Sequence, residues 1–97
     1  MPAYVTLFNF TEQGIRSIKD SPTRVKAAGE AAKSMGGRII GAWWLLGQYD
    51  GIVILEMPDD ETATRFLAAT GMQGNVRTTT MRAYSEEEMA RIVGGIP

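Results

Sequence analysis

The chain contains no cysteine and no histidine among its 97 residues. Without cysteine it can form no disulfide, iron–sulfur cluster or zinc ribbon, and it has no thiol nucleophile. Without histidine it lacks the usual general base near neutral pH, the commonest metal ligand and the common axial ligand of haem. We therefore expect no metal site and no cofactor. Haem chemistry would need a tyrosine or a bound small molecule in place of the missing histidine.

An excess of charge of one sign and long hydrophobic runs are also missing. Lys and Arg number 10 and Asp and Glu 11, which gives a net charge of −1, so bulk charge does not indicate a nucleic-acid partner. The longest apolar runs, 42–46 and 52–55, are far shorter than the roughly 20 residues of a bilayer helix. Residues 1–7 show no secretory signal pattern. We expect a cytoplasmic protein with no membrane partner, folded as a single domain over residues 1–97.

The residue pattern predicts strands and helices in the order strand, helix, strand, strand, helix, strand. The six segments cover residues 3–10, 22–35, 38–46, 51–57, 59–71 and 75–84. A short helix over 11–19 precedes the first long helix, whose N-cap is predicted at Ser21, before Pro22. Ser85 to Glu88 fits a capping box that opens a short C-terminal helix. This order predicts an α+β fold, a ferredoxin-like β-α-β-β-α-β sandwich with strands paired in the order 4-1-3-2.

The two middle strands are apolar on both faces. On the predicted strand 38–46, one face carries Ile40, Ala42, Trp44 and Leu46, and the other carries Ile39, Trp43 and Leu45. On the predicted strand 51–57, one face carries Ile52 and Ile54, and the other carries Val53, Leu55 and Met57. In a two-layer sandwich the helices cover only one face, and an uncovered apolar face marks an interface. We predict a homodimer of the dimeric α/β barrel type, free to assemble further, with residues 85–97 reaching onto the partner or sealing an edge. The alternative is a monomer whose C-terminal helix covers the face.

The stretch Gly47 to Asp50, which reads Gly-Gln-Tyr-Asp, lies between two predicted strands and is followed by the apolar segment 52–60. Together with Tyr4 to Gly14 and Arg77 to Tyr84, these residues give the chain a pattern that resembles the GYD domain family of small bacterial and archaeal proteins. The family is named for a Gly-x-Tyr-Asp stretch in this place, and the resemblance covers nearly the whole chain. It implies a ferredoxin-like fold akin to the dimeric α/β barrel proteins and no established biochemical activity.

Aromatic and polar residues near the turn are candidates for ligand contacts. Gln48, Tyr49 and Asp50 would place a phenol and a carboxylate at the mouth of a pocket, where they could orient a ligand or relay a proton. Alternatively, Asp50 builds the turn and Tyr49 packs over the sheet edge. Trp43 and Trp44 are adjacent on a strand and therefore point to opposite faces. Either they form an aromatic wall for a flat ligand, or they fill the core and the interface.

Polar residues also interrupt the apolar pattern of the first and last strands, at Thr6, Asn9, Arg77, Thr78, Thr80 and Arg82. Such residues either line a cavity or lie on a solvated edge. Because the first strand is central in the predicted order, Asn9 is the preferred pocket candidate. Arg77 and Arg82 are predicted to be exposed charges on an edge strand, where they discourage aggregation.

The sequence is compatible with three functions. The first is a homodimeric module that binds or senses a small apolar or aromatic molecule in a cleft between sheet and helices. Its candidate ligand contacts are Asn9, Trp43, Trp44, Gln48, Tyr49 and Asp50. The second is a non-catalytic dimerisation or interaction protein with a filled core. The third, by analogy of fold alone, is a metal-free oxygenase or isomerase. An RNA-binding sheet is excluded because residues 52–55 carry neither stacking aromatics nor basic neighbours.

Overall fold

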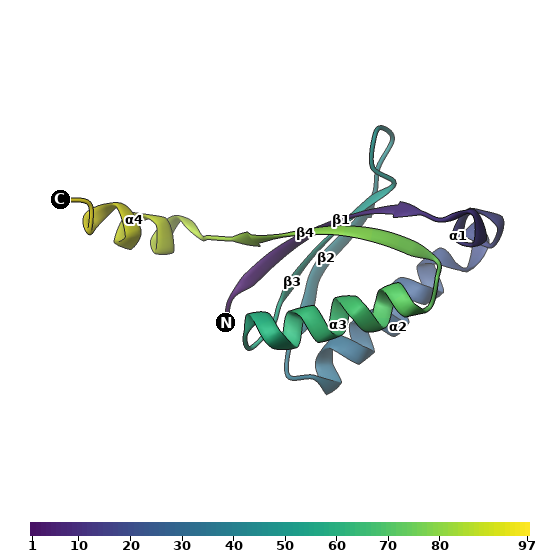
Figure 1. The fold of residues 1–97 in the computed structure, drawn as a ribbon, viewed down its shortest axis with the longest axis horizontal. Coiled ribbons are helices and arrows are strands. Elements are labelled where there is room, and N and C mark those ends of the chain that lie inside the picture. Colours follow the sequence, from purple (N-terminus) through teal and green to yellow (C-terminus); the bar gives the residue numbers. More distant parts are fainter.

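The computed structural model describes residues 1–97 as an antiparallel sheet with two long helices packed on one side of it (Figure 1). The strands are β1 (Ala3–Phe10), β2 (Arg38–Trp44), β3 (Gly51–Glu56) and β4 (Val76–Ala83), and the helices are α1 (Glu12–Arg16), the 3-10 turn η1 (Ile18–Asp20), α2 (Ser21–Ser34), α3 (Asp60–Met72) and α4 (Glu86–Gly94). The sheet order β2-β3-β1-β4 confirms the predicted strand pairing and the ferredoxin-like α+β fold. None of these helices combines the length and the apolar character that crossing a membrane requires.

Three of the helices are preceded by a residue whose side chain caps the helix N-terminus. Thr11, Asp59 and Ser85 each accept a hydrogen bond from a backbone N–H in the first turn of the helix that follows. At Ser85 the predicted capping box is complete, because Glu88 accepts in return from the backbone N–H of Ser85. Short polar side chains at these positions satisfy N–H groups that would otherwise lack partners, which is why the helices start there.

The prediction that Ser21 caps α2 is wrong. Asp20 holds the N-cap position without a side-chain hydrogen bond, and Ser21 is the first helical residue. The hydroxyl of Ser21 instead accepts a hydrogen bond of 3.0 Å from the indole N–H of Trp44, which reaches α2 from the end of β2. The indole donor needs an acceptor, and this tertiary contact takes the hydroxyl from its expected local role.

The core lies between the sheet and helices α2 and α3. Its buried side chains are Tyr4, Ala32, Leu55, Met57, Ala63 and Phe66. Tyr4 of β1 and Leu55 of β3 are paired across the two strands, so both point to the side of the sheet that the helices cover. We call this the helix-facing side.

The opposite side of the sheet is uncovered, and we call it the open face. Its apolar side chains are Val5 and Leu7 of β1, Trp43 of β2, Ile52 and Ile54 of β3 and Met81 of β4. Trp43 and Met81 remain 53% and 46% exposed. The ring of Trp43 lies over Gly41, where a Cβ atom would meet it, so this glycine lets the indole lie flat on the strand.

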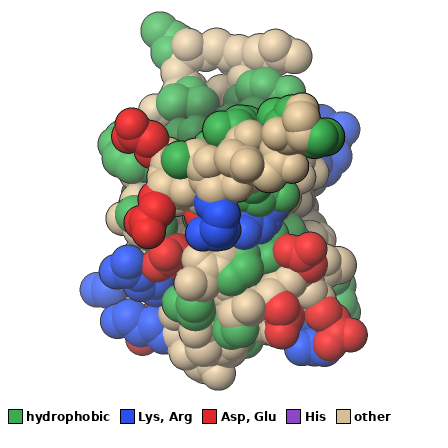
Figure 2. All heavy atoms as spheres, turned by 90° about the vertical axis from the view of Figure 1, so that its left-hand side faces the viewer, with side chains coloured by type: hydrophobic (Ala, Val, Ile, Leu, Met, Phe, Trp, Pro, Cys, Tyr) green, Lys and Arg blue, Asp and Glu red, His purple; other side chains and the backbone are tan.

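The C-terminal helix leaves the open face bare. Helix α4 continues from the end of β4 and extends away from the sheet and the other helices (Figure 1). The alternative in which the monomer covers its own sheet with this helix is therefore wrong. In the view toward the end that carries the C-terminus, charged side chains gather mainly in the lower half of the surface, while the upper half is mostly hydrophobic or neutral (Figure 2).

Candidate functional site

A cavity of about 180 Å³ lies between α2, α3 and the helix-facing side of the sheet. Alanines of the two helices leave this space open, because their side chains are too short to reach across it. The sheet supplies apolar side chains such as Val53 and Leu55 on one half and the hydroxyl residues Thr6 and Thr78 on the other. A mainly apolar concave pocket with a few converging polar groups is the usual form of a small-molecule site.

A polar groove lies beside the cavity, between α3 and β4. Within it the hydroxyl of Tyr4 donates a hydrogen bond to the carboxylate of Asp60. Burial of the phenol, and then its contact with Asp60, raises the pKa of Tyr4 to about 12. Tyr4 therefore stays protonated at neutral pH and acts as a hydrogen-bond donor, not as a base.

Arg82 lies at the end of this groove. Its guanidinium carbon is 4.6 Å from the ring centroid of Tyr84 and 5.8 Å from that of Tyr4. The prediction of exposed edge charges is right for Arg77 and wrong for Arg82, which is half-buried. Arg82 occupies a helix-facing position opposite Tyr4, so it stacks against the aromatic rings instead of extending into water.

The loop between β2 and β3, residues 45–50, is tied to the sheet by Asp50. The carboxylate of Asp50 accepts from the backbone N–H of Phe10 at 2.9 Å. Its own N–H donates to the carbonyl oxygen of Phe8, and its carbonyl oxygen accepts from the N–H of Leu45, both also at 2.9 Å. Asp50 thus ties the loop to β1 and holds the two ends of the loop together, which gives the Tyr-Asp end of the motif a structural role.

Asp50 provides the first testable prediction. We expect Asp50→Ala to lower the free energy of unfolding by about 1 to 3 kcal/mol, because the N–H of Phe10 loses a charged acceptor. Gln48→Ala is the matched control in the same loop, since Gln48 takes part only through its backbone carbonyl. We expect the control to change stability by less than about 0.5 kcal/mol. Urea unfolding measures both values, and equal losses would contradict the assignment.

The residues predicted to contact a ligand are distributed over three places. Asn9, Gln48 and Asp50 lie at the loop with Tyr49 beside them, Trp43 lies on the open face, and Trp44 lies against α2. The amide of Asn9 donates to the carbonyl oxygen of Gln48 at 2.9 Å. None of the six lines the cavity, although Trp44 bonds to Ser21, which does. Their role as ligand contacts remains a prediction.

Thr6 and Thr78 line the cavity in place of the preferred candidate, Asn9. Strand alternation explains this placement, because Thr6 shares the helix-facing side of β1 with Tyr4, whereas Asn9 is an odd number of residues away. Counting in steps of two from Tyr4 would have assigned Thr6 to the buried side of the strand and Asn9 to the other side.

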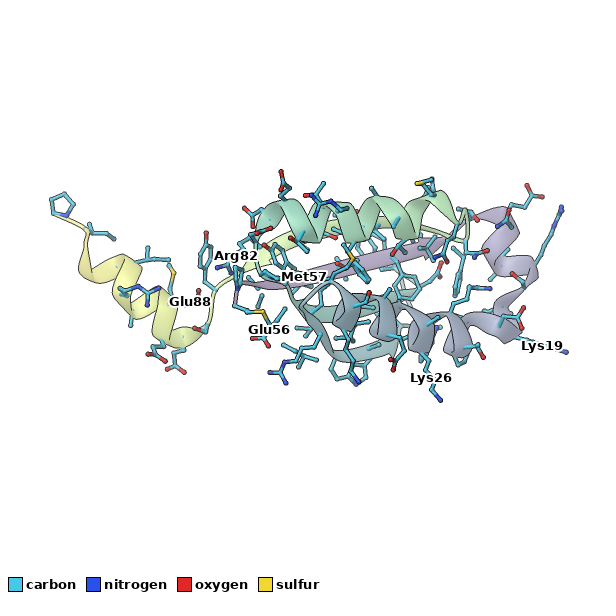
Figure 3. All side chains as sticks on the ribbon, turned by 90° about the horizontal axis from the view of Figure 1, so that it is seen from below. Lys19, Lys26, Glu56, Met57, Arg82 and Glu88 are labelled. Carbon is cyan, nitrogen blue, oxygen red and sulfur yellow. The ribbon has the colours of Figure 1, made fainter.

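Helix α4 is attached to the sheet through Arg82 and Glu88, which lie at its junction with β4 (Figure 3). Their side chains form an ion pair at 3.3 Å, and Glu88 also accepts from the backbone N–H of Ser85 at 2.9 Å. The hydrogen bond from the Ser85 N–H contributes most to lowering the pKa of Glu88, and the contact with Arg82 lowers this pKa further.

We predict that the first turn of α4 loosens in acid. A carboxylate with a lowered pKa stabilises the fold above the ordinary glutamate pKa, and this contribution is lost as the pH falls through the lowered value. The ¹³Cα shifts of residues 86–93 should therefore lose helical character as the pH falls below the ordinary glutamate pKa of 4.5. In Glu88→Gln that change should be largely absent, whereas Glu87→Gln, which alters an exposed neighbour, should keep it. An identical response in both variants would contradict this role of Glu88.

A family model described as the GYD domain matches residues 4–93, nearly the whole chain. This chain belongs to the GYD domain family. The match includes the opening strand, the Gly-x-Tyr-Asp loop and the fourth strand, which are the segments that carry the resemblance in the sequence.

Two proteins of Thermus thermophilus are similar to this GYD domain. One is named "Glutamine synthetase and cystathionine beta-lyase binding protein"; it is 29% identical over 84 residues, which cover 86% of this chain and 88% of the relative. The other is a crystal structure that matches 88% of this chain and 95% of its own, with a TM-score of 0.54 and 21% identity. At that identity the second match supports the fold alone.

Proposed function

We propose that this GYD domain is a cytoplasmic interaction protein that works as a homodimer. Two copies pair open face to open face, which closes their sheets into a dimeric α/β barrel. The observation that carries the proposal is the uncovered apolar surface formed by the open-face side chains of all four strands. A contiguous apolar patch of this kind on a small protein is typical of an interface.

The charges around the open face favour a second copy as the occupant. A two-fold contact brings the same surface together with itself, so charges at its centre would face like charges. The middle of the open face carries none. Its charged residues lie at the ends of the strands, with the Arg38–Glu56 ion pair of 2.7 Å at one end and Arg77 at the other. An apolar centre with a polar rim is the usual layout of protein interfaces.

Helix α4 offers a second apolar surface without a partner. Met89, Ile92 and Val93 lie on one side of the helix and are 49%, 44% and 46% exposed. Because α4 points away from its own sheet (Figure 1), these side chains are available to pack against another chain. In the proposed dimer α4 packs on the partner, as the sequence predicts for residues 85–97.

The Thermus relative supports a role beyond self-association. Its name states that it binds two enzymes, glutamine synthetase and cystathionine beta-lyase. We extend this property to the present dimer as part of the proposal. Co-sedimentation with each purified enzyme from the same organism tests it, and we expect a complex with at least one. A dimer that sediments apart from both would contradict this part.

The absence of cysteine makes pairing of the sheets testable by single-cysteine cross-linking. Val5→Cys and Ile54→Cys place a lone thiol on adjacent central strands of the open face. Treated with a short bismaleimide, both variants should yield covalent dimers at high efficiency. Ala68→Cys places the thiol on the exposed side of α3 as a control and should not. Equal cross-linking at all three positions would contradict the interface.

The cavity supports a second candidate function, the binding or sensing of a small molecule by each subunit. Its volume of about 180 Å³ and its mainly apolar lining are the observations in favour. Native mass spectrometry of the purified protein, compared with the denatured protein, tests this function. A small extra mass that is lost on denaturation is the expected result, and an empty protein that also fails to bind any added compound would contradict it.

A further inference from the structure

The helix-facing side of the sheet is divided into an apolar half and a hydroxyl-bearing half. Strands β2 and β3 contribute Ile39, Val53 and Leu55 to the cavity, whereas β1 and β4 contribute Thr6 and Thr78. Thr6 is only 5% exposed, at a position where valine would have the same shape and no polar atom. Burying a hydroxyl costs free energy unless it is hydrogen-bonded; Thr6 meets this condition through Thr80, whereas Thr78 is exposed.

The hydroxyls of this half keep capacity for further hydrogen bonds. Thr6 and Thr80 lie with their Oγ1 atoms 2.8 Å apart, and one donates to the other. Each hydroxyl has one donor and two acceptor sites, so this pair retains one O–H and several lone pairs. Thr78 lines the same cavity but is exposed, so its hydroxyl is open to water or to a ligand. A ligand could therefore both donate to and accept from this strip of threonines.

The interior of the cavity is almost free of charge. Arg24 is the single ionisable residue in its lining, and no carboxylate takes part. The guanidinium of Arg24 is held by backbone oxygens, at 3.0 Å from that of Ser17 and 3.3 Å from that of Gly14. An ionised ligand would lose part of its hydration there, and the one charged group it would meet is Arg24, whose guanidinium is already hydrogen-bonded to backbone oxygens. A neutral ligand avoids this cost.

The size of the cavity limits the ligand to about one ring. Its volume is about 180 Å³, and an apolar protein cavity of about 150 Å³ is known to hold benzene. The small side chains of Ala28 and Ala31 on α2 and Ala69 on α3 leave this space open. Larger residues at these positions would fill it.

We infer that the cavity binds an uncharged molecule of about one ring, whose hydroxyl or carbonyl group faces Thr6 and Thr78 and whose apolar body lies against Val53 and Leu55. This inference rests on the second function proposed above and adds the chemical class of the ligand. It places the site on the threonine strip, away from the Trp43–Asp50 segment.

Three probes of similar size test the ligand class: phenol, toluene and benzoate. Titration of the intact protein, followed by ¹H–¹⁵N spectra, should show binding in the order phenol, toluene, benzoate. Thr78→Val should weaken phenol about three- to tenfold, the effect of one lost hydrogen bond, and leave toluene unchanged. Thr79→Val is the matched control, because Thr79 is the next residue on β4 and belongs to the opposite side of the sheet. It should leave phenol binding unchanged.

A cavity-filling variant keeps the test independent of the hydroxyls. Ala28→Leu should abolish binding of phenol and toluene together. Benzoate binding as tight as phenol, or an equal loss in Thr78→Val and Thr79→Val, would overturn the inference. If native mass spectrometry finds a bound molecule but no probe binds, the ligand class is wrong and the binding function stands. If neither method finds a ligand, both fail.

Discussion

Ile54→Glu will convert the proposed dimer into a monomer. Ile54 lies on a central strand of the open face, opposite Val5. In a two-fold contact the substitution introduces two carboxylates, one from each copy, into an apolar layer that offers them no partner. We expect the dissociation constant of the dimer to rise at least about 100-fold, which corresponds to about 2.7 kcal/mol. Size-exclusion chromatography with light scattering measures the change in mass.

Ala68→Glu is the control for this substitution. It adds the same charge on the exposed side of α3, away from the open face. The control should elute and scatter as the wild-type protein does. Loss of the dimer in both variants would mean that net charge controls association, and an intact Ile54→Glu dimer would mean that another surface carries the contact.

Leu55→Ala will destabilise the fold itself by about 2 to 5 kcal/mol. Leu55 is fully buried on the helix-facing side, in the core cluster with Phe66 and Ala63. Removing most of its side chain loses apolar burial and enlarges the space beside α3. Because this contact lies within one chain, the loss should be the same at high and low protein concentration.

Ile54→Ala separates the two sides of the same strand. Its neighbour Leu55 faces the helices, whereas Ile54 faces outward. For the wild-type protein, the urea midpoint should fall on dilution, since a dimer gains stability with concentration. Ile54→Ala should remove most of that concentration dependence while Leu55→Ala keeps it. The opposite pattern would contradict the assignment of the faces. Both variants are measured by urea unfolding at two protein concentrations.

Local sequence signals predict the elements well where each signal acts within a few residues. The strand over residues 3–10 and the capping box at Ser85 both occur in the structure as predicted. The two-sided apolar pattern of β3 also corresponds to one buried face and one open face. These features depend on period and on first-turn hydrogen bonds, which neighbouring residues alone determine.

Features set by contacts between distant segments were harder to predict. Ser21 looks like an N-cap until the indole of Trp44 arrives from β2 and takes its hydroxyl. Arg82 looks like an edge charge until the pairing of β1 with β4 sets it beside Tyr4. The cavity has no local signal either. It arises because short side chains from α2 and α3 meet over the threonines of the sheet.

Sedimentation equilibrium of the wild-type chain over a wide range of concentrations tests most directly whether the open face joins two copies. We predict a mass of about twice the 10.6 kDa of one chain, falling toward the mass of one chain only on strong dilution. A mass of one chain at every concentration would contradict it, because the open face and helix α4 would then remain bare in solution.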